Sequence, residues 1–310
     1  MTTLLLLEQL LNGLQLGVTL FLMAAGLTLV FGVMGLINLA HGSLYMLGAF
    51  FCAWVTNTTG SFLLGLLAGF TGAALVGAII EVIVIRKLYA RDHLDQVLAT
   101  FALILIFSEG TSWIFGATPL YLSIPQWLSG SVPLWFGENG GSYPLYRLLI
   151  IVIGLIIAYG LYLLITKTRL GMRIRAGESD REMIAALGVD IRTIYTVVFA
   201  LGAALAGLAG ALVGALRSVE VGMGEPVLIL ALVVIVIGGI GSVKGALVAA
   251  ILVGVVDTMG RVFLPDFLGI FIQDSSNLAT LSASLSSVLV YILMALILAI
   301  RPQGLFPANG

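Results

Sequence analysis

A run of 72 residues, Gln9 to Ile80, contains no Asp, Glu, Lys or Arg. Soluble domains of ordinary composition have about 25% charged residues, and their loops and surfaces could not be built from a stretch of this kind. Across the whole chain only 9% of residues are charged, 60% are hydrophobic, and the mean hydropathy is +1.17. The chain is therefore predicted to be an integral membrane protein that crosses the bilayer several times.

The apolar runs predict helices rather than barrel strands. A bilayer core about 30 Å thick needs roughly 20 apolar residues in a helix, and runs of that length occur here without the alternation that barrel strands require. Nine candidate helices are predicted, near residues 5–31, 36–56, 62–86, 95–116, 145–166, 193–217, 227–241, 245–260 and 279–300. We predict an all-α polytopic membrane fold with about 8–9 transmembrane helices, in a single transmembrane domain spanning residues 1–310.

The distribution of basic residues predicts the orientation, because cytoplasmic loops collect Lys and Arg. Eleven of the 14 basic residues fall on one side of the nine-helix arrangement. They are Arg86, Lys87, Arg91, the six in the 167–192 loop, Lys244 and Arg301. This side is predicted to be cytoplasmic, which places the N-terminus outside and the C-terminus in the cytoplasm.

Two apolar segments, 34–45 and 238–248, are broken by glycines and polar residues. The residues concerned are Asn38, His41, Gly42 and Ser43 in the first segment, and Gly238, Gly239, Gly241, Ser242 and Lys244 in the second. Unwound backbone at membrane depth is tolerated only beside a cavity or inside protein, and paired broken helices point to a transport path. We predict that these residues belong to a translocation path. Re-entrant segments, or two tight cytoplasmic turns, are the alternatives.

Three carboxylates lie within or near predicted spans. Glu81 precedes Arg86 and Lys87 by about one turn, and Asp257 precedes Arg261 by four residues, so both are predicted to form structural ion pairs. Glu109 has no basic neighbour within a turn. An ionisable residue within a span is by default a candidate functional residue, so Glu109 is added to the predicted translocation path.

Several functions are excluded by what is missing from the sequence. No Gly-x-x-x-x-Gly-Lys-Ser/Thr phosphate loop is present, so this chain is not expected to bind ATP by that device. Its single cysteine, Cys52, excludes disulfide frameworks and thiolate metal sites. The histidines His41 and His93 are not at metal-ligand or catalytic-triad spacing. We therefore predict a non-enzymatic protein without a metal, a cofactor or a nucleic-acid partner.

The 167–192 loop holds ten of the chain's 29 charged residues. Its charges predict a cytoplasmic platform between two spans, with an amphipathic helix over residues 178–188 that Gly188 ends. A helix of about ten residues is marginal by itself, so it is expected to dock on a partner that couples ATP hydrolysis to transport. The candidate coupling residues are Arg173, Arg175, Glu178, Asp180, Arg181, Glu182, Ala185, Ala186 and Gly188. A solvated loop is the alternative.

Segment 116–146 is the longest predicted outer segment and is rich in proline, tryptophan and tyrosine. Aromatic residues of this kind gather at the membrane–water interface. The segment is predicted to be periplasmic, either as a lipid-interface anchor or as a docking surface for an external partner.

Four motifs resemble one known family. They are Phe31-Gly-Val-Met-Gly-Leu-Ile-Asn-Leu-Ala-His-Gly42, Ile240-Gly-Ser-Val-Lys-Gly245, the Arg173-x-Arg-Ala176 loop running into Ala185-Ala-Leu-Gly188, and Arg301-Pro-Gln-Gly-Leu-Phe306. Together they are similar to the permease subunits of bacterial branched-chain amino acid ABC importers, and the similarity covers essentially the whole chain.

The resemblance implies a multi-pass permease of the bacterial inner membrane, surrounded by lipid, that works with a second homologous permease, two ATPase subunits and a periplasmic substrate-binding protein. ATP would be used by those partner subunits, and the 178–188 helix would be the coupling helix. The expected substrates are branched-chain or other hydrophobic amino acids. Permeases for urea or short amides share nearly the same Asn38–Gly42 motif, so that substrate class stays open, as does an autonomous channel or secondary carrier.

Overall fold

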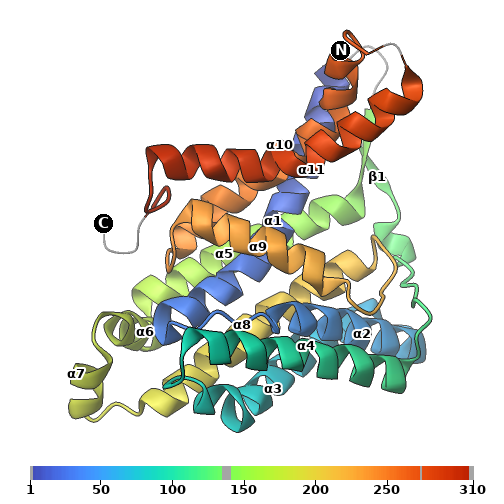
Figure 1. Ribbon diagram of the computed structural model, residues 1–310. Helices are drawn as coiled ribbons and strands as arrows, with labels where there is room; N and C mark the ends of the chain where they lie inside the picture. Colours follow the sequence, from blue (N-terminus) through green and yellow to red (C-terminus); the bar gives the residue numbers. More distant parts are fainter. Residues whose placement is uncertain (1–2, 135–140, 273, 307–310) are drawn as a thin grey trace.

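The computed structural model describes residues 3–134, 141–272 and 274–306, and within them the chain is mostly helical (Figure 1). The α-helices are α1 (Thr3–Met34), α2 (His41–Thr59), α3 (Phe62–Ile83), α4 (His93–Phe115), α5 (Leu145–Lys167), α6 (Arg169–Ser179), α7 (Arg181–Ala186), α8 (Ile191–Gly214), α9 (Gly224–Gly238), α10 (Val243–Leu268) and α11 (Ser275–Ile300). Two single-turn helices, η1 (Ile85–Lys87) and η2 (Gln126–Leu128), and two strands, β1 (Ser131–Leu134) and β2 (Gly141–Pro144), complete the described elements.

Seven of the described helices are long and apolar enough to cross a membrane. They are α1, α3 extended through η1, α4, α5, α8, α10 and α11. Helix α9 is a shorter apolar helix of 15 residues. The prediction of an all-α polytopic membrane protein is confirmed, while the exact number of crossings and the orientation of the termini stay predictions.

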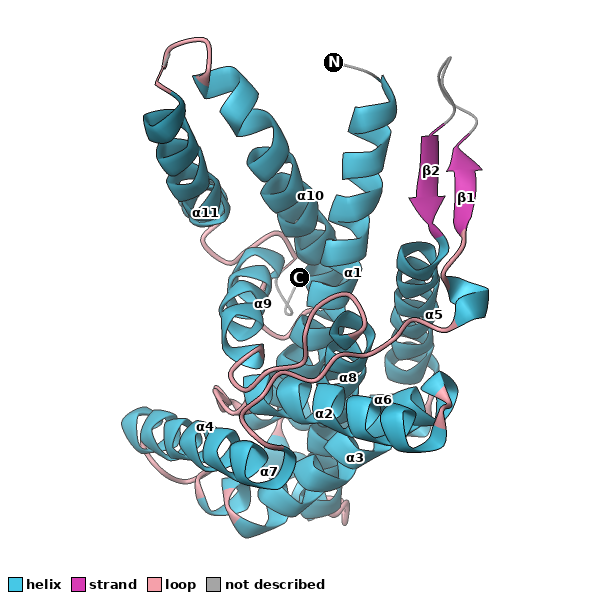
Figure 2. Ribbon diagram, turned by 90° about the vertical axis from the view of Figure 1, so that its right-hand side faces the viewer, coloured by secondary structure: helices cyan, strands magenta, loops and turns pink. Residues whose placement is uncertain are grey.

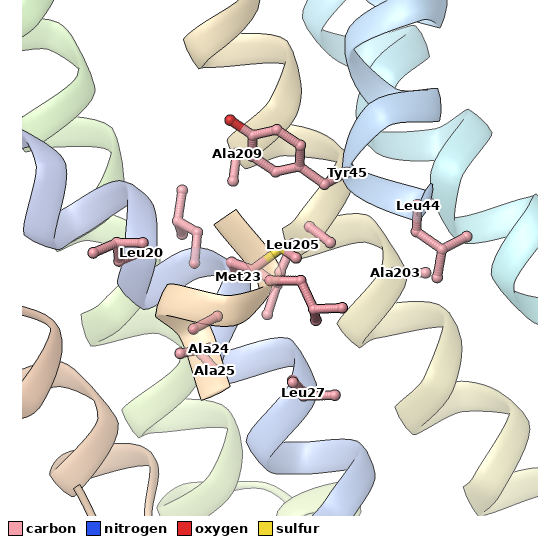
Figure 3. Close-up of a cluster of buried hydrophobic side chains, with 14 of the residues drawn as sticks. Leu20, Met23, Ala24, Ala25, Leu27, Leu44, Tyr45, Ala203, Leu205 and Ala209 are labelled. Carbon is pink, nitrogen blue, oxygen red and sulfur yellow. The ribbon is translucent and has the colours of Figure 1, made fainter. Parts of the chain in front are cut away.

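Helices α1 and α8 form the centre of the bundle. The most apolar part of α1 is 83% buried and that of α8 is 72% buried, against 22% for α4 or α5. Figure 3 shows side chains of α1, α2 and α8 meeting in this core, among them Leu20, Met23, Leu27, Leu44, Tyr45, Leu205 and Ala209. A helix that is apolar on every side is stable only when it is surrounded, which explains why α1 carries no polar stripe.

Glycines allow these helices to approach closely. A β-carbon on Gly48 of α2 would overlap the backbone of Gly207 of α8, and one on Gly17 of α1 would lie 2.7 Å from the α-carbon of Ile251 in α10. Without side chains at these positions the backbones pack directly, as in other helix pairs in membranes.

The prediction of one amphipathic helix over residues 178–188 is wrong. This segment contains the end of helix α6 and a separate short helix, α7. Helix α6 continues to Ser179, and the extended backbone of Asp180 (φ −153°) then breaks the chain. The Asp180 carboxylate accepts a hydrogen bond from the Met183 backbone N–H (2.9 Å), which caps α7. The amphipathic helix therefore covers only Arg181–Ala186.

The strands β1 and β2 were not predicted. They form an antiparallel pair in the predicted outer segment, with Ser131 opposite Pro144 and Leu134 opposite Gly141. In Figure 1 this pair and the start of α1 lie toward the upper right, whereas α6, α7 and the end of α11 lie toward the left.

Candidate functional site

The first broken segment is a tight turn between α1 and α2. Gly35 has φ +67° and its N–H donates to the Phe31 carbonyl (2.7 Å), so it ends α1 in the left-handed conformation that glycine favours. The Asn38 carboxamide then accepts a hydrogen bond from the Ala40 N–H (3.1 Å), and the Asn38 carbonyl accepts one from the His41 N–H (3.2 Å). These bonds reverse the chain and start α2 at His41, five residues later than predicted.

This turn is buried together with its polar side chains. Asn38 and His41 are each 1% exposed and Ser43 is 4% exposed. The His41 ring bonds to the main chain of Met23 and its Nε2 atom faces Gly26 of α1. Within the described chain, neither His41 Nε2 nor Asn38 Nδ2 has a hydrogen-bond partner. Buried polar atoms without partners are rare in folded proteins, so each of these two atoms needs an explanation.

Helix α9 contacts the start of α2. A β-carbon on Gly42 would lie 2.9 Å from the Gly224 carbonyl oxygen and 3.4 Å from the β-carbon of Leu228. The backbone at the first break therefore packs against the first turn of α9.

The second broken segment lies at the other end of α9. Gly239 and Gly241 have φ values of +100° and +85°, which a residue with a side chain rarely adopts. The Ser242 hydroxyl then accepts a hydrogen bond from the Gly245 N–H (3.1 Å) and caps α10. Gly238 and Gly245 pack against each other across the turn.

The C-terminal segment covers this second turn. The N–H of Leu305 donates to the Ile237 carbonyl (2.8 Å) and that of Phe306 to the Gly238 carbonyl (3.0 Å). Lys244 is exposed, with its ammonium group 5.5 Å from the centre of the Tyr162 ring on α5. The second broken segment is thus a turn covered by the C-terminal segment, with the charged Lys244 at the surface. The first broken segment differs, because its polar side chains are buried.

The predicted path residues are not brought to one place. A 15-residue helix is about 21 Å long between its terminal residues, and the two broken segments lie at opposite ends of α9. Glu109 lies elsewhere again, exposed on α4, whose Phe115 packs 5.2 Å from the Phe50 ring of α2. Asn38, His41, Gly42 and Ser43 form one compact group at the first break, and Gly238, Gly239, Gly241 and Ser242 form a separate one at the second.

The predicted coupling residues lie in and around α6 and α7. Arg173 and Arg175 are exposed on α6, and the Arg175 guanidinium donates to the Ile165 carbonyl at the end of α5. Ala185, Ala186 and Gly188 are exposed. The side chains of Glu178, Arg181 and Glu182 lie outside the described part of the structure.

Among the described side chains of α7 and of Leu187, which follows it, one is buried and several apolar ones are exposed. Ile184 is 7% exposed, whereas Met183 is 58% and Leu187 is 74% exposed. Gly188 has φ +83° and its N–H donates to the Ala185 carbonyl (3.0 Å), which ends the helix. Hydrogen bonds from the Thr193 hydroxyl and nearby backbone lower the pKa of Asp190, which caps α8. A short turn with a cap at Asp190 therefore links α7 to a central helix of the bundle.

Both predicted ion pairs are confirmed. Arg261 contacts Asp257 at 2.9 Å, and Arg86 contacts the fully buried Glu81 at 2.8 Å. Two further hydroxyls, those of Tyr89 (2.9 Å) and Thr196 (2.7 Å), donate to the Glu81 carboxylate. Burial and the Glu81 charge raise the pKa of Tyr89.

Sequence reasoning missed two features near these sites. Thr28 on α1 is fully buried and its hydroxyl has no hydrogen-bond partner among the described residues. The sequence signal for Thr28 was a hydroxyl residue within the apolar run that follows Thr19. The sequence carries no signal for the Thr196–Glu81 hydrogen bond, because the two residues are 115 positions apart.

The family model described as "Branched-chain amino acid transport system / permease component" matches residues 9–298. No solved structure matches the chain.

The curated relatives cover almost the whole chain. The high-affinity branched-chain amino acid transport system permease protein BraD of Pseudomonas aeruginosa is 31% identical, over 96% of this chain and 95% of its own length. The corresponding LivH protein of Escherichia coli K12 is 26% identical, over 96% and 94%. A probable branched-chain amino acid transport permease protein LivH of Methanocaldococcus jannaschii is 28% identical, over 81% and 79%.

These relatives are named as permeases and not as enzymes. With its seven helices capable of spanning a membrane, the chain is a multi-pass protein of the inner membrane. It belongs to the family of permease components of branched-chain amino acid transport systems.

Proposed function

We propose that this chain is the transmembrane permease subunit of an ATP-driven importer for branched-chain or other hydrophobic amino acids. In this assembly a second homologous permease completes the membrane unit, two ATPase subunits bind and hydrolyse ATP, and a periplasmic binding protein supplies substrate. The chain itself would bind no cofactor. The names of the relatives support the substrate class, since they are branched-chain amino acid permeases.

The buried turn at Asn38–Ser43 supports a path for a zwitterion. Because the His41 ring bonds to the Met23 main chain through its other nitrogen, neutral His41 presents Nε2 as an acceptor, and Asn38 Nδ2 is a donor. An amino acid carries one ammonium donor and one carboxylate acceptor. We infer that these two atoms gain partners when the turn opens during transport, and that the glycines beside it allow this rearrangement.

The observation that carries the ATP-driven assignment is the exposed surface of α7. This helix is six residues long, too short to be stable without tertiary contacts, and it leaves Met183 and Leu187 exposed on the predicted cytoplasmic side. A partner that packs on this surface would stabilise it. Movement of that partner on ATP binding would be transmitted through Asp190 to α8.

The coupling role is tested by Ala186→Arg, which places a long charged side chain on the exposed surface of α7. ATPase activity of the assembled transporter should persist while amino acid uptake falls at least tenfold. The reason is that the substitution leaves the fold intact but disrupts the contact between α7 and the ATPase subunit. Ala90→Arg, an exposed alanine in the other predicted cytoplasmic turn, is the matched control and should leave uptake unchanged. Normal uptake in the Ala186→Arg variant would exclude α7 as the coupling element.

A further inference from the structure

The exposed face of α5 changes from apolar to aromatic toward the predicted cytoplasmic end of the helix. Val152 and Ile156 are 51% and 64% exposed, and Tyr159 and Tyr162 follow them at 64% and 41%. Because these residues recur every three or four positions, they form one stripe along the helix, the α5 stripe. Figure 2 shows α5 at the edge of the bundle. Tyrosines at the end of an apolar face mark the membrane–water interface, so we expect this stripe to face lipid.

Helix α6 folds back against the last turn of α5. The Thr168 hydroxyl accepts a hydrogen bond from the Gly171 N–H (3.1 Å) and caps α6. A β-carbon on Gly171 would overlap the carbonyl oxygens of Leu164 and Ile165, so the two backbones pack directly. The Arg175 guanidinium also donates to the Ile165 carbonyl. Helix α6 is therefore held at the membrane boundary, beside the end of α5.

Two arginines lie one turn apart on the outer side of α6. Arg169 and Arg173 are exposed, and Met172 beside them is 57% exposed, whereas Ile174 is buried. Like charges four positions apart repel each other and destabilise a helix. Among the described residues, neither guanidinium has an ion-pair or hydrogen-bond partner. A bound anion would offset this repulsion.

A third segment brings another cation to the end of the α5 stripe. Lys244 lies in the first turn of α10, and its ammonium group is 5.5 Å from the centre of the Tyr162 ring. The exposed Lys167 ends α5 five residues beyond Tyr162, or about 7.5 Å along the helix axis. Neither lysine forms an ion pair with a described carboxylate. Basic residues from α5, α6 and α10 thus gather where one lipid-facing stripe ends.

We propose that an anionic phospholipid of the leaflet on the predicted cytoplasmic side binds where these three helices meet. Its phosphate group lies among four basic side chains, those of Lys167, Arg169, Arg173 and Lys244. One of its acyl chains lies along the α5 stripe. Guanidinium groups bind phosphate oxygens through paired hydrogen bonds, and clusters of four or more basic residues next to a spanning helix attract anionic lipids.

A lipid fits this place better than a soluble occupant does. Inorganic phosphate or an acidic protein surface would neutralise the charges but leave the apolar stripe uncovered. A phospholipid covers both, because its charged and apolar parts follow each other in the same order as those of the helix. The inference goes beyond the proposed function and leaves α7, the proposed coupling element, free for the ATPase.

Photo-labelling with lipids tests the site. The full chain, purified in detergent with any subunits that accompany it, is irradiated with phosphatidylglycerol or phosphatidylcholine carrying a diazirine in one acyl chain. Phosphatidylglycerol should label peptides of the α5 stripe about tenfold more than phosphatidylcholine. Inorganic phosphate should reduce this labelling no more than chloride at equal ionic strength. Equal labelling by the two lipids, or specific displacement by inorganic phosphate, would overturn the inference.

Substitution of the arginines gives an independent measurement. Arg169→Gln combined with Arg173→Gln should lower phosphatidylglycerol labelling about tenfold. Lys87→Gln combined with Arg91→Gln is the matched control, since it removes the same charge from exposed positions on the same predicted side, and it should change nothing. Protection of the buried Cys52 thiol shows that each variant is folded.

Undiminished labelling of the folded double arginine variant would contradict the proposal. The measurement requires neither ATP nor transport, so its outcome is separate from that of the proposed function. Failure of the proposed function would instead appear as the absence of ATP-driven uptake, whatever lipid the chain binds.

Discussion

Single polar residues hold this apolar bundle together at a few points, and the Glu81 cluster is the clearest of them. Its carboxylate accepts hydrogen bonds from Arg86, Tyr89 and Thr196, and so joins the end of α3 to the start of α8. Spacing along the sequence predicts the Glu81–Arg86 and Asp257–Arg261 pairs, because both partners lie within about a turn. It cannot predict Thr196, since that contact depends on how α3 and α8 pack.

Glu81→Ala should lower the free energy of unfolding by roughly 2–3 kcal/mol, because it leaves Arg86 and two hydroxyls without their acceptor. The expected loss is below that for a fully buried pair, since Arg86 is partly exposed. Labelling of Cys52, the sole cysteine and fully buried, reports unfolding in detergent as temperature rises. Asp92→Asn, at an exposed turn, should label like the wild type. Identical melting of Glu81→Ala and the wild type would rule out a stabilising role.

The presence of the helices can be predicted from the apolar composition of the chain. Where each helix begins and ends depends instead on particular residues in the turns. Long apolar runs predict every spanning helix to within a few residues at most ends. The exceptions have physical causes: hydrogen bonds of Asn38 delay α2 to His41, and the Asp180 cap divides the predicted 178–188 helix. Helix α10 extends past its predicted end at 260 to Leu268, even though it contains Pro265. The β1–β2 pair escaped prediction because its strands are four residues long and lack a clear alternation.

Packing between α2 and α8 depends on the absence of a side chain at Gly48. Gly48→Ala should lower the free energy of unfolding by about 2–3 kcal/mol, because its β-carbon would overlap the backbone of Gly207, which can move only with its helix. Gly160→Ala on α5 is the matched control: it meets open space and should be neutral or stabilise by up to about 1 kcal/mol. Labelling of the Cys52 thiol as temperature rises measures the unfolding of both variants. Equal stability of the two variants would show that α2 and α8 separate without cost.

At the scale of the whole molecule, the sequence predicts the class of protein better than the layout of its candidate site. Low charge and long apolar runs predict a polytopic helical protein, and four short motifs predict its family. The motifs do not reveal that the two broken segments lie at opposite ends of α9, or that Glu109 lies on an exposed face. Those positions depend on how distant helices pack, and periodicity along one helix carries no information about that.

Transport by purified components tests the account most directly. Proteoliposomes would contain this chain either alone or with its co-purified permease and ATPase subunits, with the binding protein and labelled leucine supplied outside. We predict leucine uptake only by the complex, only with ATP on the ATPase side, and not by the chain alone. Leucine uptake by the chain alone without ATP would contradict the account and identify an autonomous channel or secondary carrier.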